Sequence, residues 1–88
     1  MTGIVGGGGK RGRIAVALHY DGADAPRVVA SGQGWLGEKI IETARDHGVP
    51  IEENPALAQA LSTIEIDEEI PEALYRAIAE ILSFLLKP

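Results

Sequence analysis

No cysteine occurs among the 88 residues of this chain. Its fold can therefore contain no disulfide and no cysteine-ligated zinc, and one apolar core must hold it together. A chain of this length buries only about 60% of the surface that its unfolded form exposes, enough for a single modest core. We therefore expect one domain without a deep substrate chamber. The lack of cysteine also suits a reducing compartment, and we predict a cytoplasmic location.

Charge is distributed unevenly along the sequence. Three of the eight basic residues lie within the first thirteen positions, whereas residues 14–88 carry thirteen acidic and five basic residues. Such an acidic surface repels phosphate backbones, so nucleic acid is not an expected partner. No apolar stretch approaches the roughly 20 residues of a membrane span, and residues 1–13 lack the apolar centre of a secretory signal. We therefore predict a soluble chain that does not span a membrane.

The first thirteen residues are rich in glycine, since six of the eleven glycines lie in residues 1–12. No apolar periodicity accompanies these glycines. Glycine-rich segments without such a pattern behave as flexible chains. We therefore predict that residues 1–13 form a flexible, basic N-terminal tail and that residues 14–88 form the folded domain.

Three segments have the pattern of β-strands. Apolar and small residues alternate over Ile14–Tyr20, and Arg27–Ser31 follows after a short turn-rich link, which favours an antiparallel hairpin. Val49–Glu52 is a third, shorter strand. These segments predict a mixed α/β fold, in which a small sheet of about three strands is covered by three to four helices.

The helices are marked by their ends and by their apolar spacing. Trp35–His47 carries an apolar stripe and is followed by Gly48, a residue typical of a helix C-terminus. Asn54 is expected to cap a helix that begins at Pro55. A last helix is expected from Pro71 to about Leu86. The inward stripes of the first two helices are predicted to be Leu36, Ile40, Ile41 and Ala44, then Leu57, Ala58 and Leu61.

The last helix has more apolar surface than a helix at the edge of a small domain needs. One stripe contains Ile70, Leu74, Ile78, Ile81 and Leu85; a second contains Tyr75, Ala79, Leu82 and Leu86. One buried stripe suffices for such a helix. The second stripe is either covered by another helix or exposed for a partner protein, and the sequence leaves both possibilities open.

The segment Gly32–Gly37 matches the GxGxxG pattern of dinucleotide-binding loops, with Glu52 and Glu53 about twenty residues further on. A dinucleotide fold needs several parallel strands, however, and only three strands are expected here. We favour a turn that lets the chain leave a strand and start a helix. A small nucleotide- or phosphate-binding protein that uses this loop is kept as the alternative function.

The remaining chemistry-bearing residues do not form a recognisable site. His19 and His47 are the two imidazoles, and metal binding by them would need a third ligand. No serine, threonine or carboxylate stands in a recognisable relation to either histidine. The acidic cluster Glu65, Asp67, Glu68, Glu69 and Glu72 lacks the spacing of a calcium loop, and its ordinary role is to complement a helix dipole. We predict no enzyme activity, no metal and no cofactor.

Several short motifs follow one another in a specific order. They are Ala15-Val16-Ala17-Leu18 with Tyr20; Ala25-Pro26 with Val28-Val29-Ala30; Gly32 and Gly34; Val49-Pro50; Leu57-Ala58 with Ala60-Leu61; Glu65-Ile66 with Ile70-Pro71; and Leu74-Tyr75 with residues 77–82. Together, over about Ile14 to Leu86, they resemble the C-terminal cytoplasmic domain of FlhB. FlhB and its injectisome relatives are the substrate-specificity switch proteins of type III export machines.

The sequence departs from that family in several places. Family members carry a transmembrane part ahead of this domain and an Asn-Pro-Thr-His motif before the Ala-Val-Ala-Leu strand, where the chain cleaves itself. The four corresponding positions here are Lys10, Arg11, Gly12 and Arg13, so self-cleavage is not implied. The strand that precedes the cleavage loop in the family also has no counterpart in the predicted elements. The linker from Asp21 to Ala25 is shorter than the family's linker.

The resemblance implies a non-catalytic protein-binding domain of a flagellar or related export system. Its implied partners are export substrates of the rod or hook type and proteins of the export gate, and it could be recruited to that gate at the membrane. In the family, an apolar pocket for substrates lies between an Ala-Pro pair and the C-terminal helix. The matching residues here are Ala25, Pro26, Ala79 and Leu82.

Overall fold

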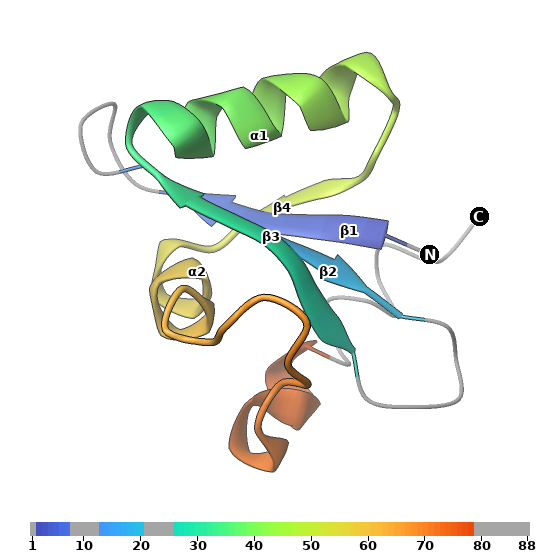
Figure 1. The fold of residues 1–88 in the computed structure, drawn as a ribbon, viewed down its shortest axis with the longest axis vertical. Helices are drawn as coiled ribbons and strands as arrows, with labels where there is room; N and C mark the ends of the chain where they lie inside the picture. The colour runs from blue at the N-terminus through green and yellow to red at the C-terminus, as the bar shows by residue number, and fades with distance from the viewer. Residues whose placement is uncertain (1, 8–12, 21–25, 79–88) are drawn as a thin grey trace.

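The computed structural model describes residues 2–7, 13–20 and 26–78. They form a four-stranded sheet in the order β3-β2-β1-β4, with helices on both faces (Figure 1). The strands are β1 (Thr2–Gly7), β2 (Ile14–His19), β3 (Arg27–Gln33) and β4 (Ile51–Glu53), and the helices are α1 (Trp35–Asp46), α2 (Pro55–Leu61) and residues 72–78. The predicted mixed α/β fold is confirmed, with one strand more than expected.

The additional strand is β1, and it corrects two expectations. It lies inside the sheet, antiparallel to β2 and parallel to β4. The prediction of a flexible tail is therefore wrong for Thr2–Gly7, and the family's strand before the cleavage loop does have a counterpart. Residues 8–12 of the predicted tail lie outside the described residues.

Close packing explains why β1 is rich in glycine. A Cβ atom on Gly7 would lie 2.6 Å from Cγ of Pro55, and one on Gly6 would lie 3.2 Å from both the Ile14 carbonyl oxygen and Cδ1 of Ile41. Glycine in a strand often marks such a close approach of another element. The glycines that suggested flexibility therefore allow α1 and α2 to pack tightly on the central strand.

The predicted hairpin of the second and third segments is confirmed. β2 and β3 pair antiparallel, with a register shift between Ala17 and Leu18. Both faces of β2 are buried: Val16 and Leu18 belong to the core on the α2 side, whereas Ala15 and Ala17 belong to the core beneath α1. The sheet is thus covered on both sides, and the small alanines match the close approach of α1.

Helix α1 faces the sheet with most of the predicted stripe: Ile41 and Ala44 are buried, and Ile40 packs against the core beneath α1. Its buried residues are Gly37, Ile41 and Ala44, whereas Leu36 is 48% exposed. The prediction of Leu36 as a core residue is wrong, because Gly37 lets the helix approach the sheet through its neighbouring face. Gly48 follows the helix with a φ of 68°, as expected for a glycine at a helix C-terminus.

Helix α2 begins and packs as the sequence predicts. The Asn54 side chain accepts a hydrogen bond from the Leu57 N–H at 3.1 Å, and Pro55 is in the first turn. This cap satisfies one of the free N–H groups of the helix start. The three residues predicted to point inward, Leu57, Ala58 and Leu61, are all buried.

Candidate functional site

Of the four predicted pocket residues, the structure describes one. Pro26 immediately precedes β3 and is buried. Ala25, Ala79 and Leu82 lie outside the described residues. The described parts of the predicted pocket region are therefore the surroundings of Pro26 and the helical residues 72–78.

A segment that follows α2 lies along the start of β3. We call residues 67–70 the strap. The Asp67 N–H donates to the Val28 carbonyl at 2.7 Å, and the Val28 N–H donates to the Glu68 carbonyl at 3.1 Å. The Ile70 N–H donates to the Pro26 carbonyl at 3.1 Å. The strap thus extends the sheet by a short antiparallel pairing and ties the segment before the last helix to Pro26.

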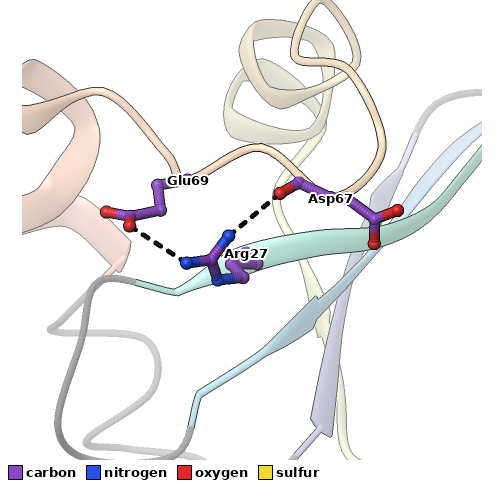
Figure 2. A network of polar contacts seen from close by, with 3 residues as sticks. All are labelled: Arg27, Asp67 and Glu69. Carbon is purple, nitrogen blue, oxygen red and sulfur yellow. Dashed lines mark hydrogen bonds and ion pairs between the residues drawn. The ribbon is translucent and has the colours of Figure 1, made fainter.

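Arg27 adds side-chain contacts to this pairing (Figure 2). Its Nη1 donates to the Asp67 carbonyl and its Nη2 lies against Oε1 of Glu69, each at 3.2 Å. Both side chains of the ion pair are about half exposed, so the pair contributes at most about 1 kcal/mol. The expected role of Glu69 as a helix-dipole partner omitted this contact, and Arg27 had no local signal that pointed to it.

Asp67 turns the chain into the strap. Its φ of 73° is left-handed, a conformation that aspartate adopts more readily than most residues. Residues 64–69 consist of turns followed by a single bridge between Glu69 and Arg27. An aspartate at this turn therefore brings the acidic cluster against β3.

The two apolar stripes of the last helix differ in exposure. On the first stripe, Ile70 and Ile78 are buried and Leu74 is half-buried, all within or against the core on the α2 side. On the second stripe, Tyr75 is 39% exposed. The first member of the surplus stripe is therefore at the surface.

The glycine loop Gly32–Gly37 packs closely against α1 and against the residue before β2. The Gly34 N–H donates to the Arg13 carbonyl at 2.7 Å. A Cβ on Gly37 would lie 2.6 Å from the same carbonyl oxygen. Glu52 and Glu53 are on β4, at the opposite edge of the sheet from β3, whereas a dinucleotide fold brings the acidic residue beside the loop. The geometry thus favours the turn over the dinucleotide fingerprint.

Gly37→Ala is expected to lower the free energy of unfolding by about 1–3 kcal/mol, because the added methyl meets backbone atoms that cannot move aside cheaply. Urea denaturation measures the loss. A titration with NAD, followed at the amides of Gly32, Gly34 and Gly37, is expected to show no binding to the unaltered chain. A stable variant together with NAD binding at these amides would restore the alternative function.

The two histidines lie in unrelated places. The Nδ1 of His19 contacts Oγ1 of Thr2 at 3.3 Å across the β1–β2 pairing. The Nδ1 of His47 donates to the Thr43 carbonyl at 2.9 Å, at the end of α1. Within the described part of the chain, no three histidine or carboxylate side chains gather as metal ligands would.

A helix-covered mixed sheet with the strap beside Pro26 defines a small α/β domain, and comparison with known proteins places it in a family. The model of the FlhB HrpN YscU SpaS Family matches residues 12–85. The chain therefore belongs to this family. No helix in the described residues has the length and apolar character needed to cross a bilayer.

The relatives include both short and long proteins. YlqH of Bacillus subtilis, described as uncharacterized, is 48% identical over 77 residues, which cover 85% of this chain and 83% of YlqH. FlhB of the same organism is 43% identical over 76 residues, and FlhB of Aquifex aeolicus is 40% identical over 76 residues; each match covers 83% of this chain. The chain spans only 21% and 22% of these two FlhB proteins.

Solved structures agree with the family assignment. The cytoplasmic domain of FlhB from Shewanella putrefaciens superposes with a TM-score of 0.81 at 34% identity, covering 93% of this chain and 66% of that domain. A variant of the EscU C-terminal domain superposes with a TM-score of 0.83 at 23% identity, covering 94% and 85%. The second likeness concerns the fold alone.

The purified chain is expected to keep a single intact mass for days at neutral pH. Lys10-Arg11 occupies the position of the family's Asn-Pro pair, so no asparagine side chain is available to attack the following carbonyl. Intact-mass spectrometry over several days measures this. A specific break between Lys10 and Arg11 that persists with protease inhibitors present would contradict the expectation.

Proposed function

We propose that this chain is a non-catalytic protein-binding domain of a flagellar or related type III export system, acting in the cytoplasm. Its partners are export substrates of the rod or hook type, or proteins of the export gate. Membership of the FlhB HrpN YscU SpaS Family across residues 12–85 supports this proposal most directly. A domain this small has one modest core and no deep substrate chamber, which suits a role in binding partner proteins.

The binding surface we propose is the apolar pocket of Ala25, Pro26, Ala79 and Leu82. Two observations on neighbouring residues support it. The hydrogen bond from Ile70 to Pro26 holds the segment before the last helix beside Pro26. Tyr75, four residues before Ala79, is partly exposed, which fits a surplus stripe that faces outward.

The proposed complex is small and transient. A patch of four small or medium-sized apolar residues falls within the weak class of interfaces, below about 1,200 Å² of buried surface. Pro26 is buried and its carbonyl accepts from the Ile70 N–H, so it is a rigid base of the pocket and not an exposed rim, which limits the backbone entropy lost on binding. Affinity should therefore depend strongly on each apolar contact at the pocket, and a charge placed there should be poorly tolerated.

Ala79→Asp and Leu82→Asp are each expected to weaken binding of a purified rod or hook-type substrate at least tenfold, measured by calorimetric titration. Ala77→Asp is the matched control, because Ala77 is exposed on the same helix and two residues from Ala79. It introduces the same charge, and we expect it to bind normally. All three variants are expected to melt cooperatively, close to the unaltered chain.

Two results would contradict the pocket. If Ala79→Asp and Leu82→Asp unfold the domain while Ala77→Asp does not, both residues belong to the core, since a buried unpaired carboxylate is strongly destabilising. If both variants stay folded and bind the substrate as tightly as the control, the binding surface lies elsewhere. Failure of the unaltered chain to bind any rod, hook or export-gate protein would contradict the proposed function itself.

A further inference from the structure

Strand β3 is an edge strand, and the strap covers only its beginning. The Gly34 N–H bonds to the Arg13 carbonyl of the neighbouring chain segment. In an antiparallel pair, residues alternate between pointing their N–H and C=O groups toward the partner and away from it. Counting back from Gly34, the backbone groups of Gln33 and Ser31 point away from β2, toward the open edge. Within the described residues, nothing bonds to these outward groups.

The covered half of the edge shows what kind of chain it accepts. There the strap uses the outward N–H and C=O of Val28 for two backbone hydrogen bonds. Arg27 adds an ion pair with Glu69 of the strap. The first half of the edge thus binds an extended acidic segment through backbone pairing and one cation.

The open half of the β3 edge also has a nearby basic side chain, Lys39 of α1, and an apolar groove. A groove of about 250 Å³ lies between α1 and the sheet, lined by Ile4, Ala30, Lys39, Ile40, Thr43 and Ala44. Ala30 is its wall on the β3 side, and α1 lies over this part of the sheet (Figure 1). A partner strand added to this edge would lie about 4.8 Å from β3. An aliphatic side chain on that strand can then extend past the methyl group of Ala30 into the groove.

Helix α1 separates its charges between its two flanks. Leu36 and Ile40 would contact a Cβ placed on Gly32, so the flank they form overhangs β3. The helical spacing puts Glu38, Glu42 and Asp46 together on the other flank. Lys39 lines the groove, and among the described residues no ion pair joins it to Glu42, three positions further along the helix. Lys39 can therefore pair with an acidic side chain of a partner at this edge, against the net charge of −5 of the whole chain.

We propose that the open edge of β3, from Val29 to Gln33, binds an extended segment of another polypeptide with alternating aliphatic and acidic side chains. The segment pairs with the backbone of Ser31 and Gln33, places aliphatic side chains in the groove and an acidic side chain at Lys39. Lys39 also disfavours a second copy of this chain, because antiparallel pairing of two β3 edges brings two lysine-bearing flanks together. This edge is separate from the proposed pocket, since Ile70 and Ile78 pack on the other face of the sheet.

The test uses the full chain, labelled with ¹⁵N, and the peptide acetyl-Glu-Val-Glu-Val-Glu-Val-amide as the probe. We expect saturable shifts centred on the amides of Ser31 and Gln33. The corresponding peptide with lysine in place of glutamate is expected to bind at least threefold more weakly. Saturation at the open edge by both peptides with equal affinity would overturn the acidic preference.

Two variants with a matched control locate the contact. Lys39→Glu is expected to weaken the probe about three- to tenfold. Arg45→Glu makes the same charge change on the other flank of α1 and is expected to have no effect. Ser31→Pro removes an outward N–H from an edge position, where proline is tolerated, and is expected to abolish the shifts while the domain melts normally.

Three results would overturn the proposal: no saturable shift at millimolar peptide, equal weakening by Lys39→Glu and Arg45→Glu, or unchanged binding in a folded Ser31→Pro variant. Shifts at Ser31 and Gln33 that grow with protein concentration in the absence of peptide would assign the edge to a second copy instead. If Ser31→Pro fails to fold, the comparison of Lys39→Glu with Arg45→Glu decides the outcome.

Discussion

Val5→Asp is expected to abolish cooperative folding. Val5 is 1% exposed in the centre of β1 and belongs to the core on the α2 side, together with Val16, Leu18 and Leu61. A carboxylate buried there has no partner, and its burial costs about 4 kcal/mol or more. A domain of this size has a total stability of about 4–13 kcal/mol, so the loss removes much or all of it. Thermal melting followed by circular dichroism measures the effect.

Thr2→Asp is the matched control for this prediction. Thr2 lies on the same strand and is exposed, so the same side chain remains in water and the melting temperature should change little. A flexible tail over residues 1–13 predicts instead that both variants melt like the unaltered chain. A cooperative Val5→Asp melt within a few degrees of the Thr2→Asp melt would therefore contradict the central position of β1.

Ile78→Ala is expected to lower the free energy of unfolding by about 2–5 kcal/mol. Its side chain is fully buried in the core that also contains Ile70, Leu57 and Leu61. Truncation removes buried apolar surface and leaves a cavity, and the cost depends on how far the surroundings relax. Urea denaturation of the variant and the unaltered chain gives the difference directly.

Tyr75→Ala is the comparison within the same helix. Tyr75 is 39% exposed, so its truncation leaves no enclosed cavity and should cost less than that of Ile78. The difference between the two variants measures how unequal the two apolar stripes are. Equal losses would mean that both stripes are buried, which would leave no surplus surface for the proposed pocket.

Features with a local cause were predictable from the sequence. Asn54 and Pro55 start α2 because a capping side chain and a fixed proline φ act within one helical turn. Gly48 ends α1 because its left-handed φ is costly for other residues. The alternation over Ile14–Tyr20 predicted the strand but only one strongly buried face, whereas both faces of β2 are buried. The family resemblance rested on the same local motifs.

Features that depend on packing between distant segments were not predictable. β1 has only Ile4 and Val5 as large apolar residues, and its glycines matter because α1 and α2 approach it closely. The strap pairs residues forty positions apart in the sequence, with no motif that marks either side. Of the predicted pocket, Pro26 is tied to the strap, whereas Ala25, Ala79 and Leu82 lie outside the described residues and remain a prediction.

The position of β1 also has a consequence for folding during synthesis. β1 precedes the other three strands in the chain but lies between β2 and β4 in the sheet. Its pairings with these two neighbours therefore form at different times. The hairpin with β2 pairs Gly7 with Ile14 and Thr2 with His19, and it can form early. The parallel pairing of Ile4 with Ile51 must wait until β4 has left the ribosome, and it closes a much longer loop. Until then, β1 exposes unpaired backbone groups to which chaperones or neighbouring nascent chains can bind.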